Sequence, residues 1–265
     1  MLEGMLVLWF ILTVCSAVYV GYDLYANTPA LNVMKIAWVL VVLYTGPVGL
    51  FLYLITCRQP LPETHDEFIA PLWKQSLGSE VHCLAGDATG IIAAAFILSF
   101  YTIPMGMEIA IEYMAGFLFG LLIFQALFMK GMMGEGYVAA VKTSLYPEWV
   151  SMNMIMAGMI PVMVIWTALE PFAADPASLH FWGKMSFATL VGGVLAYPMN
   201  YWLVAKGLKH GMVTAPKKGG PMHMKHVERT ATARDVQLMM WVSLAFLVLG
   251  CLIAIMGWAL LTAFS

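Results

Sequence analysis

The stretch KGLKHGMVTAPKKGGPMHMKHVERTATAR, residues 206–234, decides the fold of this chain. It holds seven of the thirteen lysines and arginines, and it separates two long apolar runs. Basic segments that flank membrane spans stay on the cytoplasmic side of the membrane. The stretch therefore indicates a membrane protein, and it marks the side from which the other segments can be oriented.

The composition of the whole chain agrees with a location in the membrane. Of the 265 residues, 62% are hydrophobic and only 11% are charged, whereas a soluble domain carries about 25% charged residues. The four cysteines are scattered and predict no disulfide framework. We expect a single integral membrane domain over residues 1–265 that contacts the lipid bilayer. We expect no nucleic acid as a partner, because the basic stretch is a loop between spans.

Seven apolar runs approach or exceed the length that a membrane helix needs, which is about 20 residues. Their continuous apolarity favours helices over the alternating strands of a barrel. The sequence therefore predicts an all-α fold, a polytopic bundle of about seven transmembrane helices. Within the second run, Thr45-Gly46-Pro47 predicts a break near the middle. The runs are Met5–Tyr22, Val33–Thr56, Val81–Ile103, Gly106–Phe128, Val150–Leu169, Phe181–Val204 and Val236–Phe264.

The lysines and arginines also predict an orientation. With a cytoplasmic N-terminus, residues 57–80, 129–149 and 205–235 lie inside and hold eleven of the thirteen basic residues, while Lys35 and Lys184 fall outside them. We therefore expect an N-in, C-out protein of the cell inner (plasma) membrane. The first segment is expected to be a cytoplasmic loop, the second a cytoplasmic loop or an interfacial helix, and the third a basic cytoplasmic loop.

Ionisable side chains are rare inside spans and usually face the bundle interior. His82, Cys83 and Asp87 open the third run, and the latter two lie one helical turn apart. Imidazole, thiolate and carboxylate groups bind transition metals, so these residues predict an inner metal site. The alternative is that the first two lie at headgroup level and the aspartate bonds to a neighbouring backbone. Gly86 and Gly90 form a GxxxG motif, which predicts close approach of another helix.

A second pair of acids, Glu108 and Glu112, lies one turn apart near the outer end of the fourth run. Two carboxylates on one helix face repel each other unless they are hydrated, protonated or bridged by a cation. The pair is therefore a candidate for cation capture. The alternative is a helix start at which acids favour the helix dipole, and Glu108 fits that interpretation better than Glu112 does.

Methionine is unusually frequent in this chain, with 22 residues. Four of them follow the spacing i, i+4, i+7, i+11 and form one stripe on the fifth run. Thioethers are soft ligands that suit Cu(I), but they are also flexible core fillers, and packing is the commoner explanation. The stripe consists of Met152, Met156, Met159 and Met163.

Two histidines of the basic stretch complete the candidate metal ligands. His223 and His226 stand three residues apart and are accompanied by two thioethers. A segment of this kind facing the cytosol can receive or release a soft metal. The alternative is a solvated loop whose lysines contact anionic lipid. Asn153 and Asn200 are expected at the same membrane level as His82.

Three motifs resemble a prokaryotic family of membrane proteins known only as a domain of unknown function. They are LYTGP at residues 43–47, HCLAG at residues 82–86 and YPMNYWLVAKG at residues 197–207, and the likeness extends roughly from Trp38 to His210. Many members of that family have HC-x-x-G-C, whereas this chain has Asp87 at the last position, which makes a harder set of ligands. The resemblance implies a polytopic membrane protein and supplies no activity.

Taken together, the residues favour handling or transport of a soft or borderline metal ion, with copper first and a copper ion as the cofactor. The outer carboxylates would capture the cation, the methionine stripe would bind it weakly in sequence, and the inner site would follow. The alternative is a non-catalytic accessory or scaffold subunit of a larger membrane complex. Its partners would be other membrane subunits or a second copy of the chain, and its polar residues would pair together and line no cavity. We do not expect an enzyme.

Overall fold

The computed structural model describes residues 1–126, 136–215 and 229–263. Apart from an isolated bridge between Ala30 and Thr214, these residues form helices and loops, which confirms the all-α prediction. Within these residues, seven helices are long and apolar enough to cross a membrane, so the chain is a multi-pass membrane protein. They are α1 (Leu2–Ala26), α2 (Asn32–Thr56), α4 (Leu72–Leu98), α5 (Met105–Phe119) with its π-helical continuation η1 (Gly120–Gln125), α7 (Tyr137–Leu169), α8 (Leu179–Ala205) and α9 (Ala233–Ala263).

Helix α2 reverses its direction at the predicted break. Gly46 has φ +58° and ψ −138°, which lies outside the helical region, and the proline that follows cannot donate a helical hydrogen bond. Trp38 of the first arm packs edge-on against Tyr53 of the second, with ring centroids 5.4 Å apart. The two arms therefore lie side by side, and α2 is a re-entrant hairpin. Each arm is shorter than the about 20 residues that a crossing needs.

Both ends of the hairpin lie beside the C-terminal end of α1. The Tyr53 hydroxyl donates a hydrogen bond to the buried carboxylate of Asp23, which also accepts one from Thr28. Arg58, which follows the second arm, lies 3.7 Å from the same carboxylate. The loops at residues 27–31 and 57–71 therefore meet at one end of the bundle.

The segment that follows α8 reaches the same end. The amide of Ala215 donates a hydrogen bond to the carbonyl of Pro29 at 2.6 Å. Thr214 is hydrogen bonded to Nδ1 of His65 at 2.7 Å, in the short helix α3 (His65–Ile69). We call the end formed by residues 27–31, 57–71 and 206–215 the basic face. The helix η2 (Pro171–Ala174) lies at the opposite end of the bundle, after α7.

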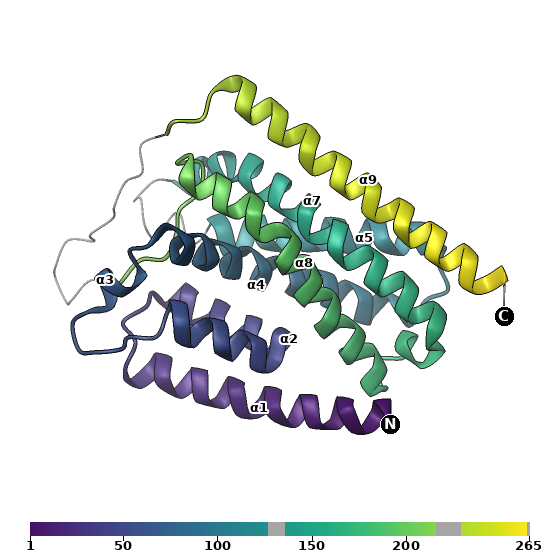
Figure 1. The fold of residues 1–265 in the computed structure, drawn as a ribbon. Coiled ribbons are helices and arrows are strands. Elements are labelled where there is room, and N and C mark those ends of the chain that lie inside the picture. Colours follow the sequence, from purple (N-terminus) through teal and green to yellow (C-terminus); the bar gives the residue numbers. More distant parts are fainter. Residues whose placement is uncertain (127–135, 216–228, 264–265) are drawn as a thin grey trace.

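The hairpin changes the predicted topology. Because α2 returns to the end from which it started, both termini lie at the end of the bundle opposite the basic face, as Figure 1 shows. The predicted orientation, by contrast, set the termini on opposite sides of the membrane, because it let the second run cross. Lys35, which that prediction placed outside, lies in the first turn of α2 and so at the basic face.

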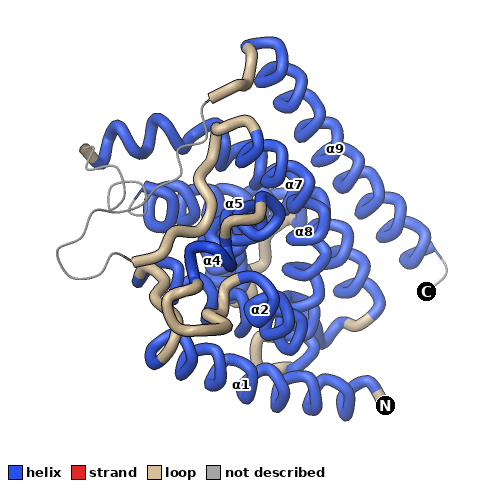
Figure 2. Tube along the Cα trace, turned by 60° about the vertical axis from the view of Figure 1, so that its left-hand side comes forward, coloured by secondary structure: helices blue, strands red, loops and turns tan. Residues whose placement is uncertain are grey.

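The remaining helices form a bundle around α4, which is the most buried of the seven, whereas α9 is the most exposed. Figure 2 shows α1 and α9 on opposite sides of the molecule, with α4, α7 and α8 between them. Helix α9 packs on α7, and α1 packs on the α2 hairpin. The centre of the bundle is thus built from α4, α7 and α8.

Helices α4 and α5 approach each other through glycines, as the GxxxG motif predicts. A Cβ atom on Gly86 would lie 2.7 Å from the Cα of Gly120, and one on Gly90 would lie 2.7 Å from the Cα of Gly116. Two GxxxG motifs of the same chain therefore face each other. Side chains at these glycine positions would prevent so close a contact. The contact places the polar residues of α4 against η1.

Candidate functional site

A group of polar side chains lies buried near the basic face, where α4, η1, α7 and α8 meet. We call it the inner cluster, and each of its members is at most 7% exposed. Polar groups in the apolar part of a membrane protein are costly unless they are paired, so such a cluster is a candidate functional site. Its members are Glu80, Cys83, Asp87, Gln125, Glu148, Ser151, Asn200 and Lys209.

Lys209 lies at the centre of the inner cluster and comes from the segment after α8. Its ammonium donates hydrogen bonds to Cys83 Sγ and, at 2.8 Å, to Asn200 Oδ1, and it lies 3.7 Å from Glu148 Oε2. Burial lowers the pKa of Lys209, but its interactions with Cys83 and Glu148 raise it by more, so the pKa lies above its ordinary value. Lys209 therefore supplies the positive group of the inner cluster.

Cys83 connects three of the elements. Gln125 Nε2 donates hydrogen bonds of 2.9 Å both to Cys83 Sγ and to Glu148 Oε2. The Cys83 thiol itself donates to Glu148 Oε2 at 3.2 Å. A thiol from α4 and a carboxylate from α7 are thus in direct contact, held by an amide from η1.

Asp87 and Glu148 are the least satisfied groups of the inner cluster. Both side chains are completely buried, and they interact with each other. A Cβ atom on Gly120 would overlap both carboxylates, so the missing side chain of this glycine provides their space. Neither oxygen of Asp87, nor Oε1 of Glu148, accepts a hydrogen bond from another described group. The carboxylates of Asp87 and Glu148 are therefore enclosed together, close to the ammonium group of Lys209.

Asn200 ties a third carboxylate to the same centre. Its amide nitrogen donates to the carboxylate of Glu80 and, at 2.8 Å, to Ser151 Oγ, while its oxygen accepts from Lys209. Glu80 precedes Cys83 by three residues and so lies on the same face of α4. The cluster thus contains three carboxylates, one thiol and one ammonium group.

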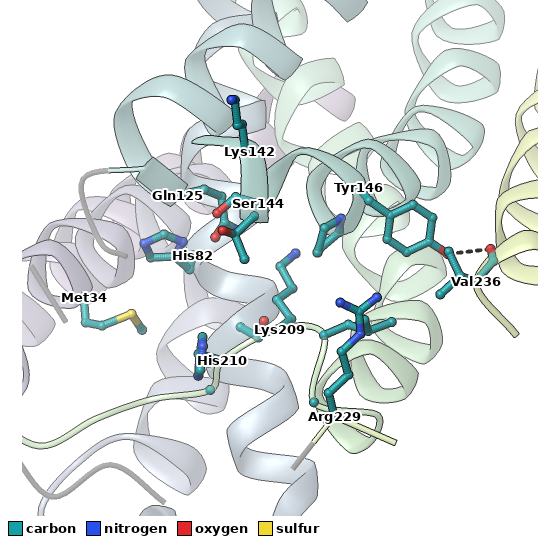
Figure 3. Close-up of a pocket in the computed structure, with 17 residues that line it drawn as sticks. Met34, His82, Gln125, Lys142, Ser144, Tyr146, Lys209, His210, Arg229 and Val236 are labelled. Carbon is teal, nitrogen blue, oxygen red and sulfur yellow. Dashed lines mark hydrogen bonds between the residues drawn. The ribbon is translucent and has the colours of Figure 1, made fainter. Parts of the chain in front are cut away.

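A cavity of about 510 Å³ reaches the inner cluster from the basic face. We call it the basic pocket. Buried side chains of His82, Gln125 and Lys209 line its inner part, and exposed Lys142 and Arg229 line its outer part. Figure 3 shows these residues around one space, contributed by helices and loops that are distant in sequence. No aspartate or glutamate is among the described residues that line it.

A second cavity, of about 330 Å³, lies toward the opposite end of the bundle, between α4, α5, α7 and α8. We call it the outer pocket. Glu108 and Glu112 line it together with Met163 and Lys184. Glu112 is buried, and its Oε2 has no hydrogen-bond partner among the described residues. Lys184 is also buried and donates to Thr167 Oγ1 at 3.3 Å.

The structure separates the predicted inner residues into two environments. Cys83 and Asp87 belong to the inner cluster, whereas His82 faces the basic pocket and packs edge-on against Phe124, with ring centroids 5.8 Å apart. Among the residues that the structure describes, no group of three histidine, cysteine, aspartate or glutamate residues is arranged to hold a metal ion. His223 and His226 lie outside the described residues.

The methionine stripe lies in the packed interior of the bundle. All four of its side chains are at most 6% exposed and belong to the hydrophobic core. Met152 packs against Gly116 of α5, and Met159 packs against Gly192 of α8. Met163 alone reaches the outer pocket. The stripe therefore fills the space between the two pockets.

Sequence reasoning missed Glu148, Gln125 and Lys209. The first was assigned to the segment 129–149, but α7 begins at Tyr137 and continues without interruption into the predicted fifth span. One signal was present, because Glu148 precedes Met152 by four residues and so extends the methionine stripe on the same helix face. For Lys209, no local pattern distinguishes it from the other lysines of the basic stretch.

A family model described as a domain of unknown function, DUF4396, matches residues 72–209. The chain belongs to this family. The DUF4396 segment begins with the first residue of α4 and ends at Lys209, so it contains every member of the inner cluster. The resemblance predicted from the motifs is thereby confirmed, although LYTGP lies outside the match. No curated protein and no solved structure matches the chain.

Proposed function

We propose that this DUF4396 protein is a membrane transporter with a cation-binding centre at Asp87 and Glu148. The observation that carries the proposal is the excess of buried negative groups in the inner cluster. Three carboxylates stand against the one ammonium of Lys209, with no water-exposed side chain among them. An uncompensated buried charge is strongly destabilising, so the pair of carboxylates is expected to take up a cation.

The two pockets support a transport path. The basic pocket ends at Lys209, while the outer pocket ends at Glu112. Along α5, Glu112 and Gly120 are eight residues apart, which corresponds to about 12 Å. The interval is filled by packed side chains such as Met152. A buried polar site that one pocket reaches from the basic face, and that packed side chains separate from a second pocket, fits a transporter in an occluded state.

The membrane placement follows from the same geometry. We assign the basic face to the cytoplasm, because basic segments remain on that side, and the membrane to the cell inner (plasma) membrane. Both termini then lie outside. This assignment also brings Lys35 to the cytoplasmic side, which leaves Lys184 as the one basic residue of the described segments near the opposite end.

The proton is the cation that the geometry favours. Two adjacent carboxylates share a site most simply when one of them carries a proton. Lys209 Nζ already occupies the place beside Cys83 Sγ and Glu148 Oε2 that a metal ion would need. The central site of the transporter is therefore a proton site, and the movement of a substrate is coupled to it.

Infrared difference spectroscopy tests this assignment. Purified protein in lipid nanodiscs should show a protonated carboxylic acid band that shifts in deuterium oxide and disappears in Asp87→Asn or Glu148→Gln. Glu67→Gln, a change at an exposed acid of α3, is the matched control and should leave the band unchanged. If both cluster variants keep the band, the proton centre is refuted.

Metal handling is the second candidate function, and copper remains its first metal. One observation favours it, namely that Cys83 contacts Glu148 and that Glu148 adjoins Asp87. Elemental analysis of the purified protein after growth with added copper tests it, with Cys83→Ser and Glu67→Gln compared. A bound metal that is lost in the first variant and kept in the second would favour this candidate over the proton.

The accessory-subunit alternative is less well supported by the geometry. It requires polar residues that pair with one another and line no cavity. The residues around Lys209 do pair, but Asp87 and Glu112 keep oxygens without a partner among the described residues, and pockets reach Lys209 and Glu112.

A further inference from the structure

The basic pocket has the volume of a small-molecule site, and the described charged residues that line it are all basic. Its volume of about 510 Å³ lies within the range of about 300–1,000 Å³ that small-molecule sites occupy. Lys142, Lys209 and Arg229 line it, together with His82 and His210. The described lining residues contribute no carboxylate. Because a cavity with cationic walls raises the local concentration of anions, the pocket should attract a negatively charged ligand.

Hydrogen-bond donors of the pocket point to the kind of anion. Ser79 lines the pocket, is 3% exposed, and its hydroxyl has no hydrogen-bond partner among the described residues. Gln125, Thr143 and Ser144 add an amide and two hydroxyl groups to the lining. Arginine, lysine and hydroxyl groups together match the oxygens of a phosphate, sulfate or carboxylate group.

We propose that the basic pocket binds a small oxyanion, which is the substrate class of the transporter. The claim that this anion is the transported substrate rests on the proposed function. The claim that the basic pocket binds an anion does not. Lys209 belongs to both sites, since it lines the pocket and contacts Cys83 and Glu148 on its other side. The negative charge behind Lys209 opposes the anion, so removal of that charge strengthens anion binding.

Calorimetric titration with sodium sulfate, at constant ionic strength and in phosphatidylcholine nanodiscs, tests the site. Sulfate should bind saturably to the wild type. Arg229→Gln should weaken binding by at least about tenfold, the cost of one charge-assisted contact. Lys206→Gln is the matched control, because this lysine lies in the same segment but does not line the pocket, and it should bind sulfate as the wild type does.

Glu148→Gln provides a variant with the opposite expected result. It removes one negative charge beside Lys209 and should tighten sulfate binding severalfold, whereas a variant that merely disturbs the fold would weaken it. Absence of saturable binding to the wild type, equal loss in Arg229→Gln and Lys206→Gln, or weaker binding in Glu148→Gln would each overturn the anion site.

The same titration in nanodiscs that contain phosphatidylglycerol separates two sources of the anion. Unchanged sulfate binding indicates a soluble oxyanion, and competitive loss indicates that a lipid headgroup occupies the same site. Both results agree with an anion site in the basic pocket. Competitive loss would overturn the proposal that the substrate is a soluble oxyanion. Sulfate uptake into proteoliposomes then tests transport separately, so that binding without uptake refutes the proposed function and leaves the anion site standing.

Discussion

Replacing Gly46 with alanine should destabilise the protein more than replacing any glycine in open surroundings. At φ +58° and ψ −138° an L-residue is strained, and the new Cβ would lie 2.7 Å from Thr13 Oγ1 and 2.9 Å from the Trp9 ring. Backbone strain of this kind costs about 1–3 kcal/mol, and overpacking costs about 1–3 kcal/mol more. We therefore expect Gly46→Ala to lower the free energy of unfolding by about 2–6 kcal/mol.

Tryptophan fluorescence during unfolding in mixed detergent micelles measures this change. Gly4→Ala is the matched control, because a Cβ there meets nothing within 4 Å, and it should leave stability unchanged or raise it by up to about 1 kcal/mol. The double variant Thr13→Ala with Gly46→Ala should recover part of the overpacking cost but none of the backbone strain. If Gly46→Ala and Gly4→Ala unfold alike, the chain does not reverse at residue 46, and the re-entrant hairpin is refuted.

Three further predictions concern topology, the carboxylate pair and pH. Reporter enzymes that are active only outside the cytoplasm should be active when fused to either terminus, and activity at one terminus alone would contradict the hairpin topology. Gly120→Ala should force Asp87 and Glu148 apart, abolish the infrared band of the carboxylic acid and cost about 1–3 kcal/mol of stability. Burial lowers the pKa of His65 below its ordinary value of 6.5, so the unfolded chain takes up the proton first. The free energy of unfolding should therefore fall as the pH drops below about 6.5, by at most about 1.4 kcal/mol per pH unit; His65→Gln, which can still contact Thr214, should remove this dependence.

The helical fold was predictable because it depends on local composition. A run such as Phe181–Val204 identifies itself as membrane helix by length and apolarity alone, whatever its neighbours are. The glycines at 86 and 90 likewise predicted a close helix contact, which α5 provides. Each of these inferences needs only one stretch of sequence, since the bilayer imposes the same requirement on every span.

The path of α2 was less accessible to sequence reasoning. Thr45-Gly46-Pro47 indicated a break, but a break is compatible with either a kinked span or a return. The two outcomes differ in distant contacts, namely those of Tyr53 and Arg58 with Asp23. No local pattern contains such a pairing. Because the second run is as long and apolar as a true span, hydropathy favoured the crossing.

The composition of the inner cluster shows the same limit at the site. Cys83 and Asp87 could be singled out because ionisable groups are rare within apolar runs. Glu148 and Lys209 were hidden because each adjoins a polar segment, where a charge is ordinary. Their burial follows from tertiary structure, in which α7 extends to Tyr137 and the segment after α8 turns back into the bundle.

That difference alters the chemistry assigned to the site. Considered without Lys209, Cys83 and Asp87 are two metal-binding side chains with no positive charge beside them, and a metal ion is the expected partner. With Lys209 in contact, a positive charge is already present, and what remains is a surplus of carboxylate on one side of the ammonium and a cationic pocket on the other. A cation taken up by Asp87 and Glu148 releases Lys209 from part of its pairing and strengthens its attraction for an anion. Under the proposed function, one buried lysine placed between two such sites would couple a proton to an oxyanion, because each ligand would raise the affinity of the protein for the other.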